Sequence, residues 1–125
     1  MSFRILHVLD HSVPLHSGYT FRTLSILREQ RKLGWETFHM TGPKQINCEE
    51  LEEDVDGWHF YRTRRSLAKL AKLPLFGQWC VMRQLENRLM QVALQLRPDI
   101  LHAHSPVLNA LPSLRVGRRL GIPVV

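Results

Sequence analysis

The chain has 125 residues, of which 44% are hydrophobic and 22% are charged, and its formal net charge at pH 7 is +6. This composition fits one soluble globular domain with its own hydrophobic core, and it excludes a disordered or fibrous chain. No apolar run approaches the ~20 residues that a membrane-spanning helix requires, so a transmembrane protein is not expected.

The N-terminal third is predicted to form a strand, a helix and a second strand. Residues 5–10 have the apolar character of a short buried strand. A loop leads to Ser17, the predicted N-cap of a helix over residues 19–33, which Gly34 ends. Residues 35–41 have the aromatic and β-branched content of a strand. The apolar residues near one face of the helix are Phe21, Leu24, Leu27 and Leu33.

The middle of the chain carries most of its clustered charge. Residues 42–57 are expected to form a loop, with room for one helical turn in the acidic part. A third strand is predicted over residues 58–63. The basic, amphipathic segment 66–73 follows and is expected to end at Pro74.

The last third has the strongest helical pattern. A helix is predicted over residues 78–96, and a fourth strand over residues 99–104. A further helix is expected to be capped by Asn109 and closed by Gly121, and residues 122–125 begin a fifth strand. The apolar positions that recur along the long helix are Val81, Leu85, Leu89, Val92 and Leu96.

This alternation of strands and helices predicts the fold class α/β, a Rossmann-like doubly wound parallel sheet in a three-layer α/β/α arrangement. Ligands of such sheets bind beyond the carboxyl ends of the strands, where the strand order reverses. The first and fourth strands are expected to be neighbours at that point. Polar residues leave both strands: Asp10, His11, Ser12, His16, Ser17, Gly18, His102, His104 and Ser105.

Gly18 opens the first predicted helix. The free N–H groups and the positive end of the helix dipole favour an anion there, and a missing side chain lets a phosphate or sugar approach. A simple turn glycine explains the same residue equally well.

His102 and His104 are two residues apart and therefore lie on one face of the fourth strand. They are candidates for metal ligands, for groups that orient a polar substrate, or for structural histidines with satisfied hydrogen bonds. A paired-histidine metal site usually has further ligands at other strand ends, as in large barrel hydrolases, and this chain is too short for such a barrel. No metal is therefore expected.

Several nucleotide-binding motifs are missing. The chain has neither GxGxxG nor GxxxxGK[ST], which disfavours a dinucleotide cofactor and a nucleoside triphosphatase. Asp10 ends the first strand, as an aspartate does in phosphoacceptor signalling domains. The third strand, however, ends in Arg62-Thr63-Arg64, where those domains need the aspartate that is phosphorylated.

Basic side chains gather after the third strand. They favour phosphate-rich partners, and with the apolar residues around them they resemble an element that docks on an anionic membrane surface. A solvated face, or a helix that packs on its own sheet, is the plain alternative. No aromatic platform or recognition motif accompanies them, so nucleic acid is not an expected partner. The residues concerned are Arg64, Arg65, Lys69 and Lys72.

The expected location is the cytoplasm, with an optional peripheral position on the inner membrane. His7 and Asp10 interrupt the apolar start that a secretory signal would need. Cys48 and Cys80 have no metal-binding or redox spacing, which favours reduced thiols.

Three stretches together resemble the N-terminal domain of family 4 retaining glycosyltransferases, which have the GT-B fold. They are residues 5–41 (ILHVLDHSVPLHSGYTFRTLSILREQRKLGWETFHMT), residues 97–106 (RPDILHAHSP) and residues 118–125 (RRLGIPVV). The wording HSVPLHSGYTFRT is similar to the subgroup associated with exosortase-linked exopolysaccharide clusters. Many relatives carry two glycines in the first loop, where this chain has Ser17-Gly18.

The resemblance implies that residues 1–125 are the acceptor-side Rossmann-like domain of an enzyme whose second, nucleotide-sugar-binding domain is absent from this chain. Such enzymes transfer a sugar from a nucleotide-sugar donor to a glycan or lipid-linked acceptor with retention, without a cofactor or an obligatory metal. Ser17 and Gly18 would approach the donor phosphate or sugar. The acceptor cleft would be lined by Asp10, His11, His16, His102, His104 and Ser105.

Three functions therefore compete. The resemblance favours a glycosyltransferase domain that is inactive by itself, because the family's paired-glutamate donor motif belongs to the second domain. The catalytic residues are then unknown from this chain. A stand-alone Rossmann-like module that binds a nucleotide or anion is the second reading, and a membrane-surface protein is the third.

Overall fold

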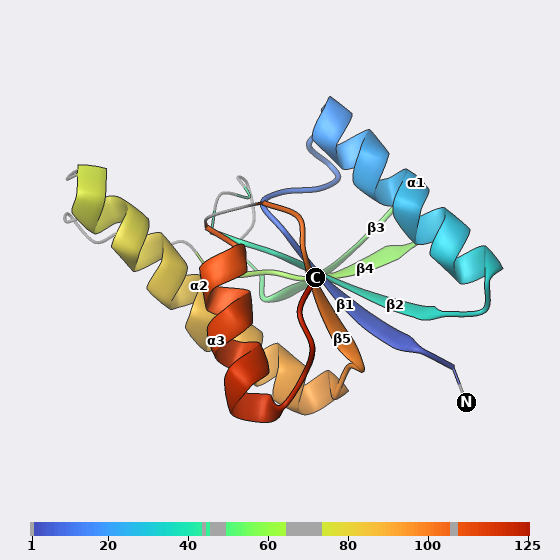
Figure 1. Cartoon of the computed structure of the whole chain (residues 1–125). Coiled ribbons are helices and arrows are strands. Elements are labelled where there is room, and N and C mark those ends of the chain that lie inside the picture. The colour runs from blue at the N-terminus through green and yellow to red at the C-terminus, as the bar shows by residue number, and fades with distance from the viewer. Residues whose placement is uncertain (1, 44, 46–49, 65–73, 106–107) are drawn as a thin grey trace.

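A five-stranded sheet with helices on both faces forms the centre of the computed structural model, which describes residues 2–43, 45, 50–64, 74–105 and 108–125 (Figure 1). The strand order is β3-β4-β2-β1-β5. Four strands run parallel and β3 is antiparallel at one edge. The bounds are β1 (Arg4–Leu9), β2 (Glu36–Thr41), β3 (Glu52–Val55), β4 (Trp58–Tyr61) and β5 (Ile100–Ala103).

The helices form the two outer layers. Helix α1 (Gly18–Lys32) covers one face of the sheet, and α2 (Pro74–Leu96) and α3 (Ala110–Leu120) cover the other (Figure 1). The α/β fold and the mostly parallel sheet are confirmed. Among the described residues, none of the helices combines the length and the apolar character needed to cross a bilayer.

The two faces of the sheet differ in chemistry. Alternate residues of β1 point to opposite faces, so Leu6 and Val8 pack under α2 and α3 while His7 and Leu9 lie on the α1 face. The α2 side is a continuous apolar core, in which each fully buried leucine contributes roughly 1.5–3 kcal/mol. The α1 face combines a smaller apolar cluster with buried polar residues from neighbouring strands: His7, Thr37, His39 and Thr41.

The hairpin of β3 and β4 corrects the expectation of a loop over residues 42–57. Val55 pairs with Trp58, which leaves a two-residue turn at Asp56 and Gly57. Both turn residues have positive φ, 51° and 81°, the type I′ geometry that suits the twist of a hairpin. Asp-Gly directly before the β-rich segment of residues 58–61 was the available signal.

Helix boundaries follow the sequence with two corrections. Ser17 caps α1 and Gly34 follows its end with φ of 86°, as expected. Leu24 and Leu27 are buried as predicted, whereas Phe21 and Leu33 are 55% and 67% exposed. Thr20 and Thr23 complete the buried face of α1. Helix α2 begins at Pro74, four residues before the predicted start, because proline is well suited to the first helical position.

Asn109 precedes α3 but makes no side-chain cap. Its Nδ2 donates instead to the Val8 carbonyl, 3.2 Å away, which ties the start of α3 to the end of β1. Gly121 closes α3 in the left-handed conformation, as predicted. The final residues then run parallel to β5, where the Leu101 and Val125 N–H groups donate to Pro123 and Leu101 carbonyls.

Candidate functional site at the exits of β1 and β5

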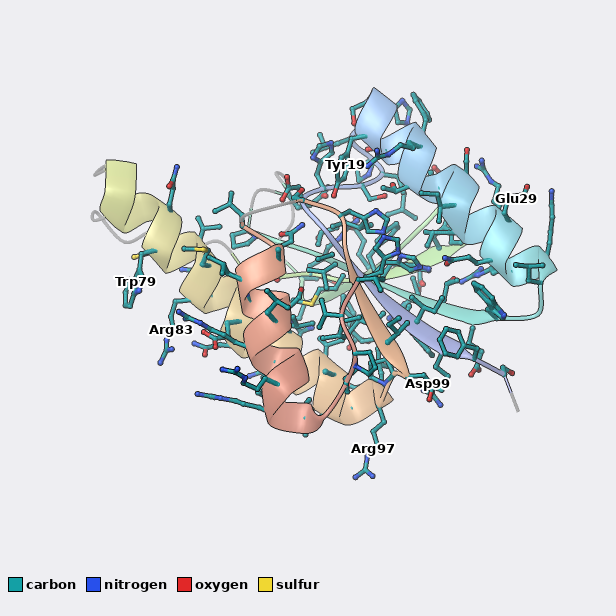
Figure 2. All side chains as sticks on the ribbon, viewed as in Figure 1. Tyr19, Glu29, Trp79, Arg83, Arg97 and Asp99 are labelled. Carbon is teal, nitrogen blue, oxygen red and sulfur yellow. The ribbon has the colours of Figure 1, made fainter. Side chains whose placement is uncertain are left out.

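The exits of β1 and β5 lie side by side, as the sequence predicted. The strands pair in parallel up to Val8 and Ala103, and the next amide, that of His104, donates to the Val8 carbonyl at 3.0 Å. The Tyr19 hydroxyl accepts from the Asp10 N–H at 3.1 Å. Burial raises the pKa of Tyr19, and the nearby Ser105 side chain opposes that rise. Figure 2 shows Tyr19 at this end of the sheet and Asp99, which precedes β5, at the other.

A chain of hydrogen bonds orders the loop that follows β1. The Thr20 hydroxyl donates to the Leu15 carbonyl and therefore accepts from Ser17 Oγ. Ser17 Oγ in turn accepts from the Thr20 N–H, the capping bond, and from His11 Nε2 at 2.9 Å. His11 thus carries its proton on Nε2. The predicted residues His11 and Ser17 are brought together at the start of α1.

Gly18 is the first residue of α1 and is exposed. A Cβ added there would meet no atom within 4 Å, and its φ lies outside the left-handed region. Packing within the described chain therefore does not require glycine at this position. The turn-glycine explanation loses its main physical support, while an approaching ligand stays compatible with the open space.

Four histidines line the α1 face of three adjacent strands. His7 of β1 is register-paired with His39 of β2 on one side and with His102 of β5 on the other. The ring centroids of His102 and His104 are 4.0 Å apart, and each lies 5.1 Å from that of His7. The sequence reasoning found His102 and His104 but missed His7, because that residue sits inside an otherwise apolar strand.

Hydrogen bonds fix the orientation of His7. Its Nε2 lies 2.7 Å from Gln30 Oε1, which can only accept, so the proton of His7 is on Nε2. Its Nδ1 is then an acceptor, and His104 Nε2 donates to it at 2.8 Å. Gln30 on α1 thereby sets the tautomers of two imidazoles on the sheet.

Burial keeps these imidazoles neutral. It lowers the pKa of His7 to about 4, against a smaller opposing effect of the Gln30 hydrogen bond. Burial, with smaller contributions from His102, His7 and Arg22, lowers the pKa of His104 to about 3, and the pKa of His102 is lowered as well. At pH 7 about one His7 in a thousand is protonated. The cluster therefore suits hydrogen bonding or ligation better than general acid catalysis.

Arg62 supports the loop from below the site. Its side chain is fully buried, and its guanidinium donates to Glu53 Oε2, to Thr41 Oγ1 at 3.1 Å and to the Val13 carbonyl at 2.8 Å. It also lies 4.4 Å from the centre of the Phe60 ring. The sequence places Arg62 only at the end of the third predicted strand, whereas the structure gives it a positioning role under the loop.

The remaining predicted residues are not part of this hydrogen-bonded group. His16 is exposed and its ring packs 5.7 Å from that of Phe21. Arg64 is exposed, and the other predicted membrane-surface residues, Arg65, Lys69 and Lys72, lie outside the described residues. An apolar groove of about 470 Å³ between α3 and the C-terminal segment lies in the layer opposite α1.

Comparisons with known proteins agree with this architecture. The C-terminal domain of a hydrogenase from Pyrococcus furiosus superposes with a TM-score of 0.65 at 16% identity, covering 98% of this chain and 89% of that one. MurG from Acinetobacter baumannii superposes with a TM-score of 0.62 at 19% identity, covering 98% of this chain. The chain spans 32% of the MurG chain. At these identities the likeness shows the fold alone.

Sequence comparison gives the family. A search of curated proteins finds no match. The family model described as "Glycosyl transferase 4-like domain" matches residues 17–125, which include α1, the exit of β5 and α3. The chain therefore belongs to the glycosyl transferase 4-like family.

Proposed function

We propose that this chain is the acceptor-side domain of a longer GT-B enzyme that transfers a sugar, with retention, from a nucleotide-sugar to a glycan or lipid-linked acceptor. The observation that carries the proposal is that the exits of β1 and β5 adjoin beside the start of α1: the His104 N–H donates to the Val8 carbonyl, and Tyr19 accepts from the Asp10 N–H. The family match supports sugar transfer in general. Membership of the exopolysaccharide subgroup is part of the proposal, and its basis is the amino-acid sequence of the first loop.

The region where the two strand exits adjoin suits both a donor phosphate and acceptor hydroxyls. The open N-terminus of α1 at Ser17 and Gly18 suits a donor phosphate, because unpaired N–H groups and the helix dipole favour anions. The half-buried imidazoles of His102 and His104 suit acceptor hydroxyls, since a neutral imidazole both donates and accepts hydrogen bonds. The proposed acceptor cleft also includes Asp10, His11 and Ser105. We include the exposed His16 in the cleft as well, although it lies outside the hydrogen-bonded group.

The test is a donor screen on the parent enzyme. Nucleoside diphosphate release is measured for several nucleotide-sugars, with and without a lipid-linked acceptor. We expect release with one donor and a clear increase when acceptor is added. The 125-residue chain is assayed alongside and is expected to show no transfer. Release by the isolated chain, or no release by the parent with any donor, would contradict the proposal.

Matched variants locate the acceptor site. Ser105→Ala in the parent is expected to raise the acceptor KM by about fivefold while leaving the donor KM near its original value, because one hydrogen bond is worth about 1 kcal/mol. His59→Gln is the control, since His59 lies on the β3–β4 hairpin and contacts Asp54 and Glu52 instead of the strand exits. Equal effects of both variants would remove the acceptor assignment.

The alternative functions predict different results. A stand-alone anion-binding module would bind nucleoside diphosphates through Gly18 but give no transfer in any longer protein. A membrane-surface protein would bind anionic liposomes in a salt-sensitive way, and neutralising Arg64, Arg65, Lys69 and Lys72 would abolish that binding. Salt-sensitive liposome binding of this kind is also the result that a peripheral location on the cytoplasmic side of the membrane predicts.

A further inference from the structure

We propose that His7, His102 and His104 form a binding site for a divalent cation of the Zn²⁺ class. Each residue offers one ring nitrogen, and these three atoms all lie within 4.8 Å of one another. The site does not depend on sugar transfer, and it departs from the expectation that no metal binds here.

The three ligands come from rigid elements. His7 lies within β1, His102 is its register partner on β5, and His104 follows two residues later on the same face. His7 is fully buried and the other two are half-buried, so the ring nitrogens converge from the sheet while one side of the cluster is partly exposed. Three protein ligands with an accessible fourth position are typical of an open zinc site.

Small movements convert the hydrogen-bonded pair into ligands. His7 Nδ1 and His104 Nε2 are 2.8 Å apart, whereas two nitrogens bound to one tetrahedral zinc at ~2.0–2.1 Å lie roughly 3.3 Å apart. In the metal-free state a proton on His104 Nε2 bridges the two atoms. Metal binding requires that proton to move to His104 Nδ1, so both imidazoles stay neutral and the cation takes the place of the shared proton.

Gln30 supplies the supporting contact that histidine ligands usually have. Its Oε1 accepts the Nε2 proton of His7 at 2.7 Å, and this contact leaves the Nδ1 lone pair of His7 directed at the other two imidazoles. A carboxylate or amide oxygen behind a ligating histidine holds the ring orientation and the tautomer. The ring of His7 is therefore already oriented as a ligand before a metal arrives.

The donor atoms select the metal. Three imidazole nitrogens without a carboxylate favour Zn²⁺ and similar ions such as Co²⁺ over Mg²⁺ or Ca²⁺, which prefer oxygen ligands.

The experiment titrates metal-free, untagged chain with ZnCl₂ at pH 7.5 by isothermal calorimetry, with Cys48 and Cys80 replaced by serine so that no thiolate contributes. We expect one Zn²⁺ per chain with a Kd below about 10 µM. CoCl₂ should give the intense visible bands of a four-coordinate ion. MgCl₂ should give no heat.

Variants identify the ligands. His102→Gln and His104→Gln should each weaken zinc binding by about a hundredfold, and Gln30→Leu by about tenfold. His59→Gln is the matched control, because His59 contacts the carboxylates of Asp54 and Glu52 and these groups could also attract zinc. Circular dichroism confirms that each variant folds.

Three results would overturn the site: a Kd for zinc weaker than about 100 µM, unchanged binding in both His102→Gln and His104→Gln, or loss of binding in His59→Gln. Each is read from zinc binding by this chain, so none depends on whether the parent enzyme transfers sugar.

Discussion

Gln30 of α1 and His7 of β1 are joined by a 2.7 Å contact between Oε1 and Nε2 beneath the helix. Twenty-three residues separate them in sequence, and the bond links the α1 layer to the buried polar face of the sheet. Because His7 is fully buried, water cannot replace the bond if Gln30 is lost.

Gln30→Leu should therefore lower the free energy of unfolding by about 1–3 kcal/mol, the cost of leaving a buried N–H without a partner. Urea unfolding at pH 7.5 measures the change. Arg28→Leu, at an exposed position of the same helix, should stay within about 0.5 kcal/mol of the unaltered chain. Equal stability of the two variants would show that the His7 contact contributes nothing.

His39 should make the fold sensitive to acid. Burial lowers its pKa from 6.5 to about 3, so the unfolded chain binds a proton there that the folded chain refuses. Stability is thus fully present above pH 6.5 and falls by about 1.4 kcal/mol per pH unit as the pH drops toward 3. His39→Asn keeps a donor for the His59 carbonyl and should reduce this slope by about that amount.

The check is a series of urea unfolding curves between pH 7 and pH 4.5. His59→Asn serves as a control of opposite sign. Burial alone would lower the pKa of His59, but hydrogen bonds to Asp54 and Glu52 raise it overall, so protonation of His59 favours the folded state in acid. An identical pH slope in His39→Asn and the unaltered chain would refute the prediction.

Gly18 and Gly57 should respond in opposite ways to alanine. Gly18→Ala is expected to leave stability unchanged to within about 1 kcal/mol, because its Cβ has open space, and to weaken donor binding by the parent enzyme about tenfold. Gly57→Ala should cost about 1–2 kcal/mol, because its φ is 81°, and leave donor binding intact. Thermal unfolding and the donor KM separate the two effects.

Arg62 is expected to be the most costly single charge to remove. Arg62→Met leaves the partly exposed Glu53 and the Val13 carbonyl without their guanidinium partner, and losing these charge-assisted hydrogen bonds costs about 1.5–3 kcal/mol. Hydrogen exchange at the Leu15 amide, which donates to the Ser12 carbonyl, should accelerate as the loop loosens. Arg64→Met, at an exposed position two residues later, should change neither measurement.

The sequence was sufficient for the parallel core of the fold. Most of its strands are apolar runs, and they are separated by helices that end at a glycine. The chain connections then place the first and fourth predicted strands, which are β1 and β5 of the structure, next to each other. The sequence alone therefore predicts that Ser17, His102, His104 and Ser105 lie at one end of the sheet. Local patterns carry this information because each strand is only four to six residues long.

What the sequence missed depends on contacts between distant segments. His7 and His39 look like interruptions of apolar strands, and their roles appear only when the register pairs them across β1, β2 and β5. Asn109 has the residue type of a helix cap, yet its side-chain amide donates to the Val8 carbonyl of β1. The β3–β4 hairpin was hidden for a different reason, since its acidic strand lacks the residues that strands prefer.

That acidic strand has a consequence for how the protein behaves at high concentration. A sheet border with unpaired N–H and C=O groups is a template on which another chain can add. Here β3 forms the border, and Glu52, Glu53 and Asp54 follow one another along it. A second copy that approached through the same border would bring its own carboxylates opposite these, so edge-to-edge pairing of two copies through β3 is disfavoured at neutral pH.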